Sequence, residues 1–378
     1  MVAMYSDPGG YGAESRPVYP PPGYGGHPGY PPPGHGYHLG FQGGYQGGYP
    51  GPAPELKPGI IALRPLNLSD IFNGAFAYIR TNPKATLGLT TIVVVIAQLF
   101  ALMLQITPLA SSGALDSAYT GDDAPAVALI GPTLGTMAGA VATWVSGIVL
   151  AGLLTVIVGR AVFGSGITIG AAWQRLRGRI WALLGFTALE AAGAVLLIGV
   201  AVGLTVVAVV AGNAASGFLV GIPLLLGTII VVVYLSTMLS FVPPLIVLER
   251  LPILAAVQRS FALIRNDFWR VLGIRLLATM VAGIIAGAVA VPFSFGGQIL
   301  LFASETTAAA VAGLVLISVG AAIGQILTSP FTAGVVVLQY TDRRIRAEAF
   351  DLVLQTGAIA GPVAPADSTD HLWLIRRP

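Results

Sequence analysis

Residues 180–211 read IWALLGFTALEAAGAVLLIGVAVGLTVVAVVA, an apolar run with a single charged residue, Glu190. About 20 consecutive apolar residues are enough for an α-helix to cross the hydrocarbon core of a bilayer. The run exceeds this length and contains no proline, so it predicts one transmembrane helix. Its excess length also predicts that the helix tilts or that its ends extend into water.

Composition extends this prediction to most of the chain. Of the 378 residues, 55% are hydrophobic and 9% are charged, and the mean hydropathy is +0.82. Soluble proteins carry roughly 25% charged residues, so this chain has too few charges to cover a surface in water. Six stretches are long enough to span a membrane: residues 86–106, 129–159, 180–211, 219–248, 271–295 and 307–338. We therefore expect an all-α integral membrane protein with a six-helix domain over residues 61–356, embedded in the lipid bilayer.

The distribution of charge predicts the orientation of these helices. The segments 107–128, 212–218 and 296–306 would lie on one side of the membrane, and they contain acidic residues but no Lys or Arg. Basic residues fall on or next to the other side: Arg64, Arg80, Lys84, Arg160, Arg175, Arg177, Arg179, Arg250, Arg259, Arg265, Arg270, Arg275, Arg343, Arg344 and Arg346. Because cytoplasmic loops are enriched in Lys and Arg, we expect both termini in the cytoplasm and the protein in the plasma membrane.

The segments before spans one, three and five resemble one another. Residues 66–88 read LNLSDIFNGAFAYIRTNPKATLG and residues 251–273 read LPILAAVQRSFALIRNDFWRVLG, and the two align without a gap. The segment before span three matches more weakly, through Trp173, Leu176–Arg177 and Leu184–Gly185. Repetition at a fixed period indicates repeated structural units. We expect three transmembrane hairpins, each preceded by a cytoplasmic amphipathic helix.

The first of these amphipathic helices shows the pattern most clearly. Ser69 is expected to cap its N-terminus, with Asp70 in the first turn, and Asn82–Pro83 is expected to end it. Its apolar residues recur at helical spacing and form one stripe: Ile71, Phe72, Ala75, Phe76 and Ile79.

The arginine that ends each amphipathic helix is a candidate anchor at the level of the lipid headgroups. These residues are Arg80, Arg177 and Arg265. The helices either hold each hairpin at the interface, or they bind anionic lipid headgroups or a cytosolic partner. The sequence leaves both interpretations open.

The two ends of the chain have a different composition. Residues 1–60 are rich in Gly, Pro and Tyr and contain few aliphatic residues, which predicts a disordered cytoplasmic tail with polyproline-II character. Such a tail is either a solvated tether or a weak, multivalent binding region for a cytosolic protein. His27, His35 and His38 lie in this tail without the context of a metal site. Residues 357–378 form a short polar cytoplasmic tail.

Glu190 and Arg275 form a candidate polar site within the membrane. Glu190 lies about ten residues into span three and Arg275 about four residues into span five, which places them within roughly 10 Å in depth. An intramembrane charge is costly and often functional. The pair is either a proton or substrate site of a transporter, or an interhelical contact that holds the helices together.

The sequence argues against several classes of chemistry. It contains no cysteine, no Walker A loop, no HExxH or GxSxG motif and no paired-carboxylate site. The predicted soluble loops are too short for a catalytic domain. We therefore expect no enzymatic activity, no cofactor, no metal site and no nucleic-acid partner.

Two motifs resemble a known family. LRPLNLSDIFNGAFAYIRTNPKATLGL (residues 63–89) opens the membrane domain, and VVVLQYTDRRIRAEAFDLVLQ (residues 335–355) closes it. Both resemble an uncharacterised actinobacterial family of Gly/Pro-rich multi-pass membrane proteins, similar to the membrane region of glycerophosphoryl diester phosphodiesterases. The resemblance covers residues 60–356 and implies the membrane fold but no activity, because the catalytic barrel of the fused enzymes is absent here. Arg343 and Arg346 of the closing motif are further candidate headgroup anchors.

These observations predict a non-enzymatic integral membrane protein that acts as a scaffold or accessory factor. One alternative is a small-solute or lipid transporter that uses Glu190 and Arg275. Another is a membrane module that docks a separately encoded lipid-modifying enzyme.

Overall fold

The computed structural model describes residues 59–62, 64–111, 126–303, 306–359 and 370–374, all within one compact unit, Pro54–Pro378. In these residues the regular secondary structure is helical, with no β-strand. The predicted all-α class is confirmed. Most of the two predicted tails, including the tyrosines and histidines of the first, lies outside the described residues.

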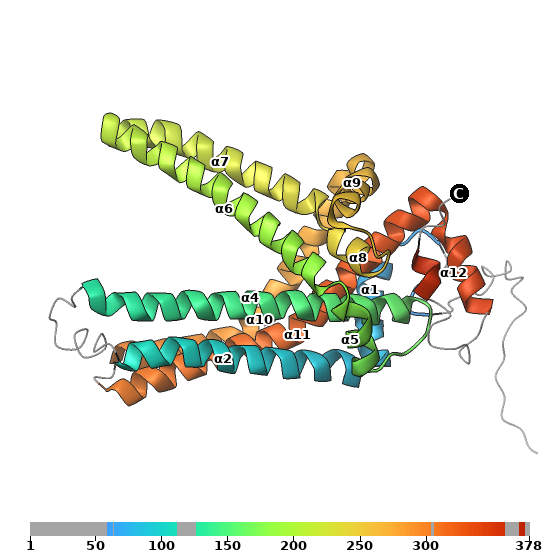
Figure 1. The fold of residues 1–378 in the computed structure, drawn as a ribbon, viewed down its shortest axis with the longest axis horizontal. Helices are drawn as coiled ribbons and strands as arrows, with labels where there is room; N and C mark the ends of the chain where they lie inside the picture. The colour runs from blue at the N-terminus through green and yellow to red at the C-terminus, as the bar shows by residue number, and fades with distance from the viewer. Residues whose placement is uncertain (1–58, 63, 112–125, 304–305, 360–369, 375–378) are drawn as a thin grey trace, which may run out of the picture. The chain divides into compact units, whose positions relative to one another are not determined.

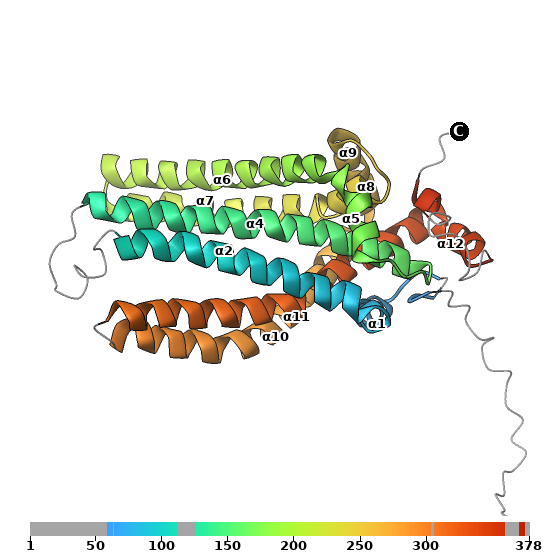
Figure 2. The same ribbon diagram turned by 60° about the horizontal axis from the view of Figure 1, so that its bottom comes forward.

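Three helical hairpins make up the membrane domain (Figures 1 and 2). They are α2 (Leu89–Ser111) with α4 (Ala126–Val162), α6 (Ile180–Ala211) with α7 (Ala214–Met238), and α10 (Phe268–Ala303) with α11 (Thr307–Glu348). The two helices of each hairpin pack against each other. Among the described residues, 6 helices are long and apolar enough to cross a membrane. The prediction of six transmembrane helices arranged as three hairpins is confirmed.

A short amphipathic helix precedes each hairpin, as the repeat predicts. We call these the elbow helices: α1 (Leu68–Thr81), α5 (Ile169–Arg177) and α9 (Ile253–Ile264). Two short elements continue the chain into the first and third hairpins, the π-helix η1 (Lys84–Gly88) and the 3-10 helix η2 (Arg265–Asp267). Arg80 lies in the last turn of α1, Arg177 ends α5 and Arg265 directly follows α9.

The N-cap of α1 differs from the prediction. Asn67, not Ser69, caps the helix, because its extended backbone turns the side-chain oxygen toward the backbone N–H of Asp70 at 2.7 Å. The Asp70 carboxylate accepts a bond from the backbone N–H of Asn67 at 3.0 Å in return. This reciprocal capping box satisfies two N–H groups that the first turn leaves free. Ser69 lies inside the helix and accepts a bond from Asn73 instead.

The first elbow helix packs against the last transmembrane helix. The Tyr78 side chain is fully buried, and its hydroxyl donates to the carbonyl oxygen of Pro330 in α11. Burial raises the pKa of Tyr78 well above its ordinary value, so the hydroxyl remains a donor. A Cβ at Gly334 would lie 2.6 Å from the Tyr78 ring, so this close approach requires glycine. Phe76 stacks on Phe331 with ring centroids 5.0 Å apart. Tyr78 was not predicted to be buried, because the stripe predicted for this helix includes only apolar residue types.

The fourth predicted span, residues 219–248, contains two helices. α7 ends at Met238, and α8 (Val242–Val247) follows after a short turn. Pro243 and Pro244 fit because they occupy the first turn of α8, where N–H groups have no partner within the helix. Pro223, Pro292 and Pro330 lie inside the long helices α7, α10 and α11.

The buried core lies at one end of the hairpins. We call this the arginine-rich end, and it contains the elbow helices, α8 and the short helix α12 (Phe350–Ile359). Away from this end, the most apolar stretch of α6 and the most apolar stretch of Ala214–Val247 contain no buried residue. Val210 near the end of α6 is 80% exposed. An apolar surface of this extent is compatible with lipid and unfavourable in water.

One backbone position at the end of α11 gives a stability prediction. Ala349 caps this helix in the left-handed conformation, with φ 50° and ψ 43°. Because a Cβ costs about 1 kcal/mol or more there, Ala349→Gly should stabilise the protein by about 1 kcal/mol in thermal unfolding of the detergent-solubilised chain. Ala347→Gly, inside the same helix and also exposed, should destabilise it by about 0.5–1 kcal/mol. Shifts of the same sign in both variants would contradict the cap.

Candidate functional site

The arginine-rich end of α11 carries a run of polar residues that are buried. In the segment QYTDRRIRAE, which ends the helix, Gln339, Thr341, Asp342, Arg343 and Arg344 are each at most 6% exposed. Burying charge is costly unless each charge is paired and hydrogen-bonded. The partners of these side chains therefore determine what the site can do.

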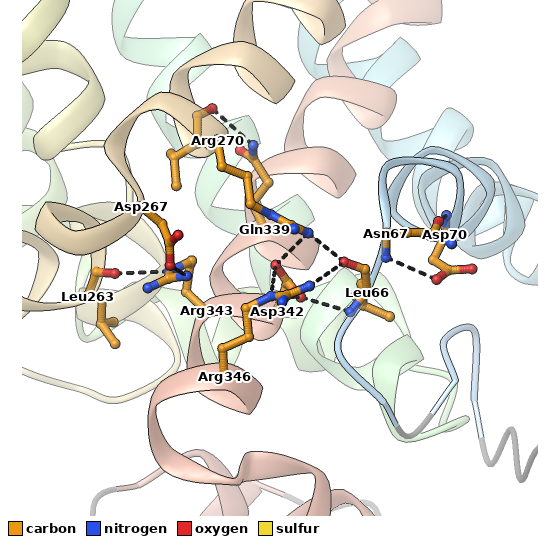
Figure 3. A network of polar contacts seen from close by, with 11 residues as sticks. Leu66, Asn67, Asp70, Leu263, Asp267, Arg270, Gln339, Asp342, Arg343 and Arg346 are labelled. Atoms are coloured by element: carbon orange, nitrogen blue, oxygen red, sulfur yellow. Dashed lines mark hydrogen bonds and ion pairs between the residues drawn. The ribbon is translucent and has the colours of Figure 1, made fainter.

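Asp342 is the centre of this network (Figure 3). It is 2% exposed and accepts the backbone N–H of Leu66 at 2.8 Å, Arg346 Nε at 2.9 Å and Arg270 Nη2 at 3.2 Å. Arg270 and Arg346 also donate to the carbonyl oxygen of Leu66, at 2.6 and 3.0 Å. Both peptide groups of Leu66 are thus bonded to the third hairpin. This arrangement fastens the start of the first repeat to the helices of the third.

A second set of bonds ties α11 to the third elbow helix, to η2 and to the start of α10. Arg343 Nε donates to the carbonyl oxygen of Leu263 at 3.0 Å, and its guanidinium pairs with Asp267. Gln339 Nε2 donates to the carbonyl oxygen of Val271 at 3.2 Å. Arg343, a predicted headgroup anchor, is buried in the structure, and its side chain bonds to these protein groups.

Glu249, directly after α8, is the other buried carboxylate of this region. It is 0% exposed at its side chain, accepts the hydroxyl of Tyr340, and pairs with Arg259 at 2.6 Å and Arg344 at 3.6 Å. Arg259 and Arg344 pair in turn with Glu348, at 2.7 and 3.0 Å. Two carboxylates and two guanidiniums thus neutralise one another between α9 and α11.

The short 3-10 helix η3 (Asp370–Trp373) packs onto the same end. Trp373 is 3% exposed, with its ring 5.4 Å from that of Phe163 and 5.1 Å from that of Phe350. Its carbonyl oxygen accepts a bond from Arg344 at 3.2 Å. Asp370 pairs with Arg175 at 2.6 Å and with Arg160 at 3.2 Å. This segment of the predicted C-terminal tail is therefore docked on the membrane domain.

The predicted intramembrane site brings three helices together. The side chains of Glu190 in α6 and Arg275 in α10 are close enough to interact electrostatically, and both are partly buried. They form no direct ion pair among the contacts of the described residues. Arg275 instead donates to the carbonyl oxygen of Ser236 in α7, at 3.1 Å.

The remaining predicted anchors differ in their surroundings. Arg80, Arg177 and Arg265 are exposed. Arg346 is 32% exposed at its side chain and held by Asp342. The roles of Glu249, Asp370 and Trp373 were not predicted from the sequence. Asp342 was indicated only by its place in the closing motif.

The fold and this site define a class, a multi-pass α-helical membrane protein whose helices are joined at one end by buried ion pairs. A family described as a domain of unknown function (DUF7847) matches residues 66–343, and the chain belongs to this family. The match begins at Leu66 and ends at Arg343, so it includes both Leu66 and Asp342, which are hydrogen-bonded to each other. No curated protein and no solved structure gives a significant match.

Removing the charge of Asp342 should strongly destabilise the protein. Asp342→Asn leaves the guanidiniums of Arg270 and Arg346 without a carboxylate, and breaking a buried ion pair costs about 3–5 kcal/mol. Asp351→Asn, in the first turn of α12, is the matched control, since Asp351 has no ion-pair partner among the described residues, and should cost less than about 1 kcal/mol. Thermal unfolding in detergent measures the stability of both variants. Equal stabilities of the two variants would contradict a stabilising role of the Asp342 network.

A double-mutant cycle tests whether Glu190 and Arg275 stabilise each other. If they do, Glu190→Gln and Arg275→Gln together should cost less than the sum of the single changes, with a coupling of about 0.5–3 kcal/mol. Pairing Glu190→Gln with Arg265→Gln, an exposed arginine outside the spans, should give additive effects. Additivity in both cycles would show that the pair has no structural role.

Proposed function

We propose that this protein is a non-enzymatic scaffold or accessory factor of the plasma membrane, with both termini in the cytoplasm. The buried network at the arginine-rich end supports this proposal. Its carboxylates, Glu249 and Asp342, are each committed to arginine partners and backbone groups, as a structural role requires. A catalytic acid or base needs access to a substrate proton, which this degree of burial opposes.

The proposed orientation rests on charge and on aromatic residues. Trp173, Trp181 and Trp269 lie in or next to the elbow region and are 45%, 83% and 80% exposed. Tryptophan is enriched where a membrane meets water, and basic residues favour the cytoplasmic side. In this orientation the network lies on the cytoplasmic side of the membrane, the side on which the Gly/Pro/Tyr-rich tail would meet cytosolic partners.

Two alternatives have specific support. A groove of about 800 Å³ between α6 and α7 is lined by apolar side chains and threonines, including Val202, Thr205 and Leu225, which suits acyl chains better than a polar solute. The apolar lining of this groove favours lipid transport over solute transport. For a module that docks a separate lipid-modifying enzyme, the support is the sequence motifs of residues 63–89 and 335–355 alone. Flux that is unchanged by Glu190→Gln in reconstituted vesicles would remove the main support for transport.

Deleting residues 1–55 tests the scaffold proposal. Because the tail carries the proposed contacts with cytosolic proteins, we expect the truncated protein to insert normally but to lose partners that cross-link to the full chain in intact cells. A second variant keeps the tail length and its Gly and Pro residues but replaces the eight tyrosines with serine. We expect this variant to lose the same partners, since the tyrosines supply the apolar contacts. An unchanged set of partners in both variants would overturn the proposal.

A further inference from the structure

We propose that a cavity at the second elbow helix binds the phosphate group of an anionic lipid headgroup, and that Asp370 is its internal counter-ion. The cavity lies at the junction of α5 and α6 and has a volume of about 660 Å³. This size falls within the range of ordinary ligand sites. Its charged lining consists of Arg175, Arg177, Arg179, Arg250 and Asp370, and His371 lies beside them.

The charges on this lining do not balance. Four arginines face one carboxylate, Asp370, which already pairs with Arg175 and with Arg160 outside the cavity lining. Within the described part of the chain, Arg177, Arg179 and Arg250 have no ion-pair partner. Elsewhere at the arginine-rich end, Arg259, Arg343 and Arg344 do have carboxylate partners. The cavity therefore has an excess of positive charge that an external anion would neutralise.

The residue types favour phosphate. The guanidinium group is planar and presents paired N–H donors, which match the oxygens of phosphate better than the point charge of an ammonium group. Three guanidiniums around one cavity can bind a phosphate from different directions. Among the described residues the lining contains no lysine, so each fixed cation described there has this geometry.

Backbone strain marks the same site. Arg250 has a φ of 58°, in the left-handed region, which costs a non-glycine residue about 1–2 kcal/mol. Strained residues of this kind persist where the surroundings fix them, and they cluster at ligand sites. Here the preceding residue, Glu249, is held in the core by its arginine partners. The turn at Arg250 thus places an arginine on the cavity wall while Glu249 stays buried.

The position of the cavity points to a lipid rather than a soluble phosphate compound. Arg177 ends the elbow helix α5, and Arg179 lies in the connection to the transmembrane helix α6. Trp173 and Trp181, on either side of this connection, are exposed. Tryptophan side chains at such positions lie at the level of the lipid headgroups. This assignment rests on the proposed placement of the elbow helices at the interface, but not on any partner of the N-terminal tail.

The repeat supplies a matched control. Arg80 and Arg265 occupy the positions equivalent to Arg177 in the other two elbow helices, and they are exposed but do not line this cavity. A double variant, Arg177→Gln with Arg179→Gln, removes two charges from the cavity. The control, Arg80→Gln with Arg265→Gln, removes the same number from the interface alone.

Binding of phosphatidic acid to the purified full chain, measured by native mass spectrometry against phosphatidylcholine, tests the proposal. The cavity variant should bind the first phosphatidic acid about tenfold more weakly than the wild type, and the control should change by less than about twofold. Asp370→Asn removes the competing carboxylate and should strengthen binding. Because this variant gains affinity, its result cannot be explained by misfolding. Arg250→Gln, which keeps the other cavity arginines, should also weaken binding.

Three results would overturn the proposal. Equal loss of phosphatidic acid in the cavity and control variants would show that binding depends on net charge and not on the cavity. Wild-type binding in the cavity variant would show that the lipid binds elsewhere. If inorganic phosphate displaces phosphatidic acid and stabilises the wild type against thermal unfolding while the lipid does not, the site binds a soluble phosphate compound.

Discussion

The buried carboxylate of Asp342 is the constraint on which the rest of the arginine-rich end depends. Once α11 places this charge in the core, its cost must be offset by nearby donors, and those donors come from three separate segments. Leu66, Arg270 and Arg346 converge on it, so the first repeat and the third hairpin are held in one arrangement. Glu249 has the same role between α8, α9 and α11. Polar pairing, rather than apolar packing alone, therefore specifies how the repeats meet.

The transmembrane helices are covered by other protein segments at one end and by lipid along the rest of their length. At the arginine-rich end, elbow helices and α8 bury large side chains such as Tyr78, Phe241 and Tyr340 completely. Toward the other end, the helices of the second hairpin expose most of their apolar surface, which a bilayer covers without further protein contacts. Close packing of protein against protein is therefore needed mainly at the arginine-rich end, where the helices leave the hydrocarbon core. This explains why the charged residues of the described chain concentrate there.

The three repeats share one plan but differ in how their arginines are used. The first and third elbow helices lie against α11 and the network around Asp342. The second carries Arg175, which pairs with the docked Asp370, and Arg177, which has no ion-pair partner among the described residues; both line a cavity. The contacts at the α5–α6 junction therefore differ from those of the other two elbow helices.

The sequence by itself determined the class of this protein, because apolar length and the scarcity of charge leave few alternatives to membrane-spanning helices. It also determined the repeat, since elbow helices and hairpins follow from local periodicity. It could not select Asn67 over Ser69 as the cap, because both residue types cap helices and only the backbone path decides between them. Only the tertiary structure placed Arg343 in the core and brought Asp370 to Arg175. Those contacts join residues far apart in the chain, and their energies depend on burial, which local sequence does not encode.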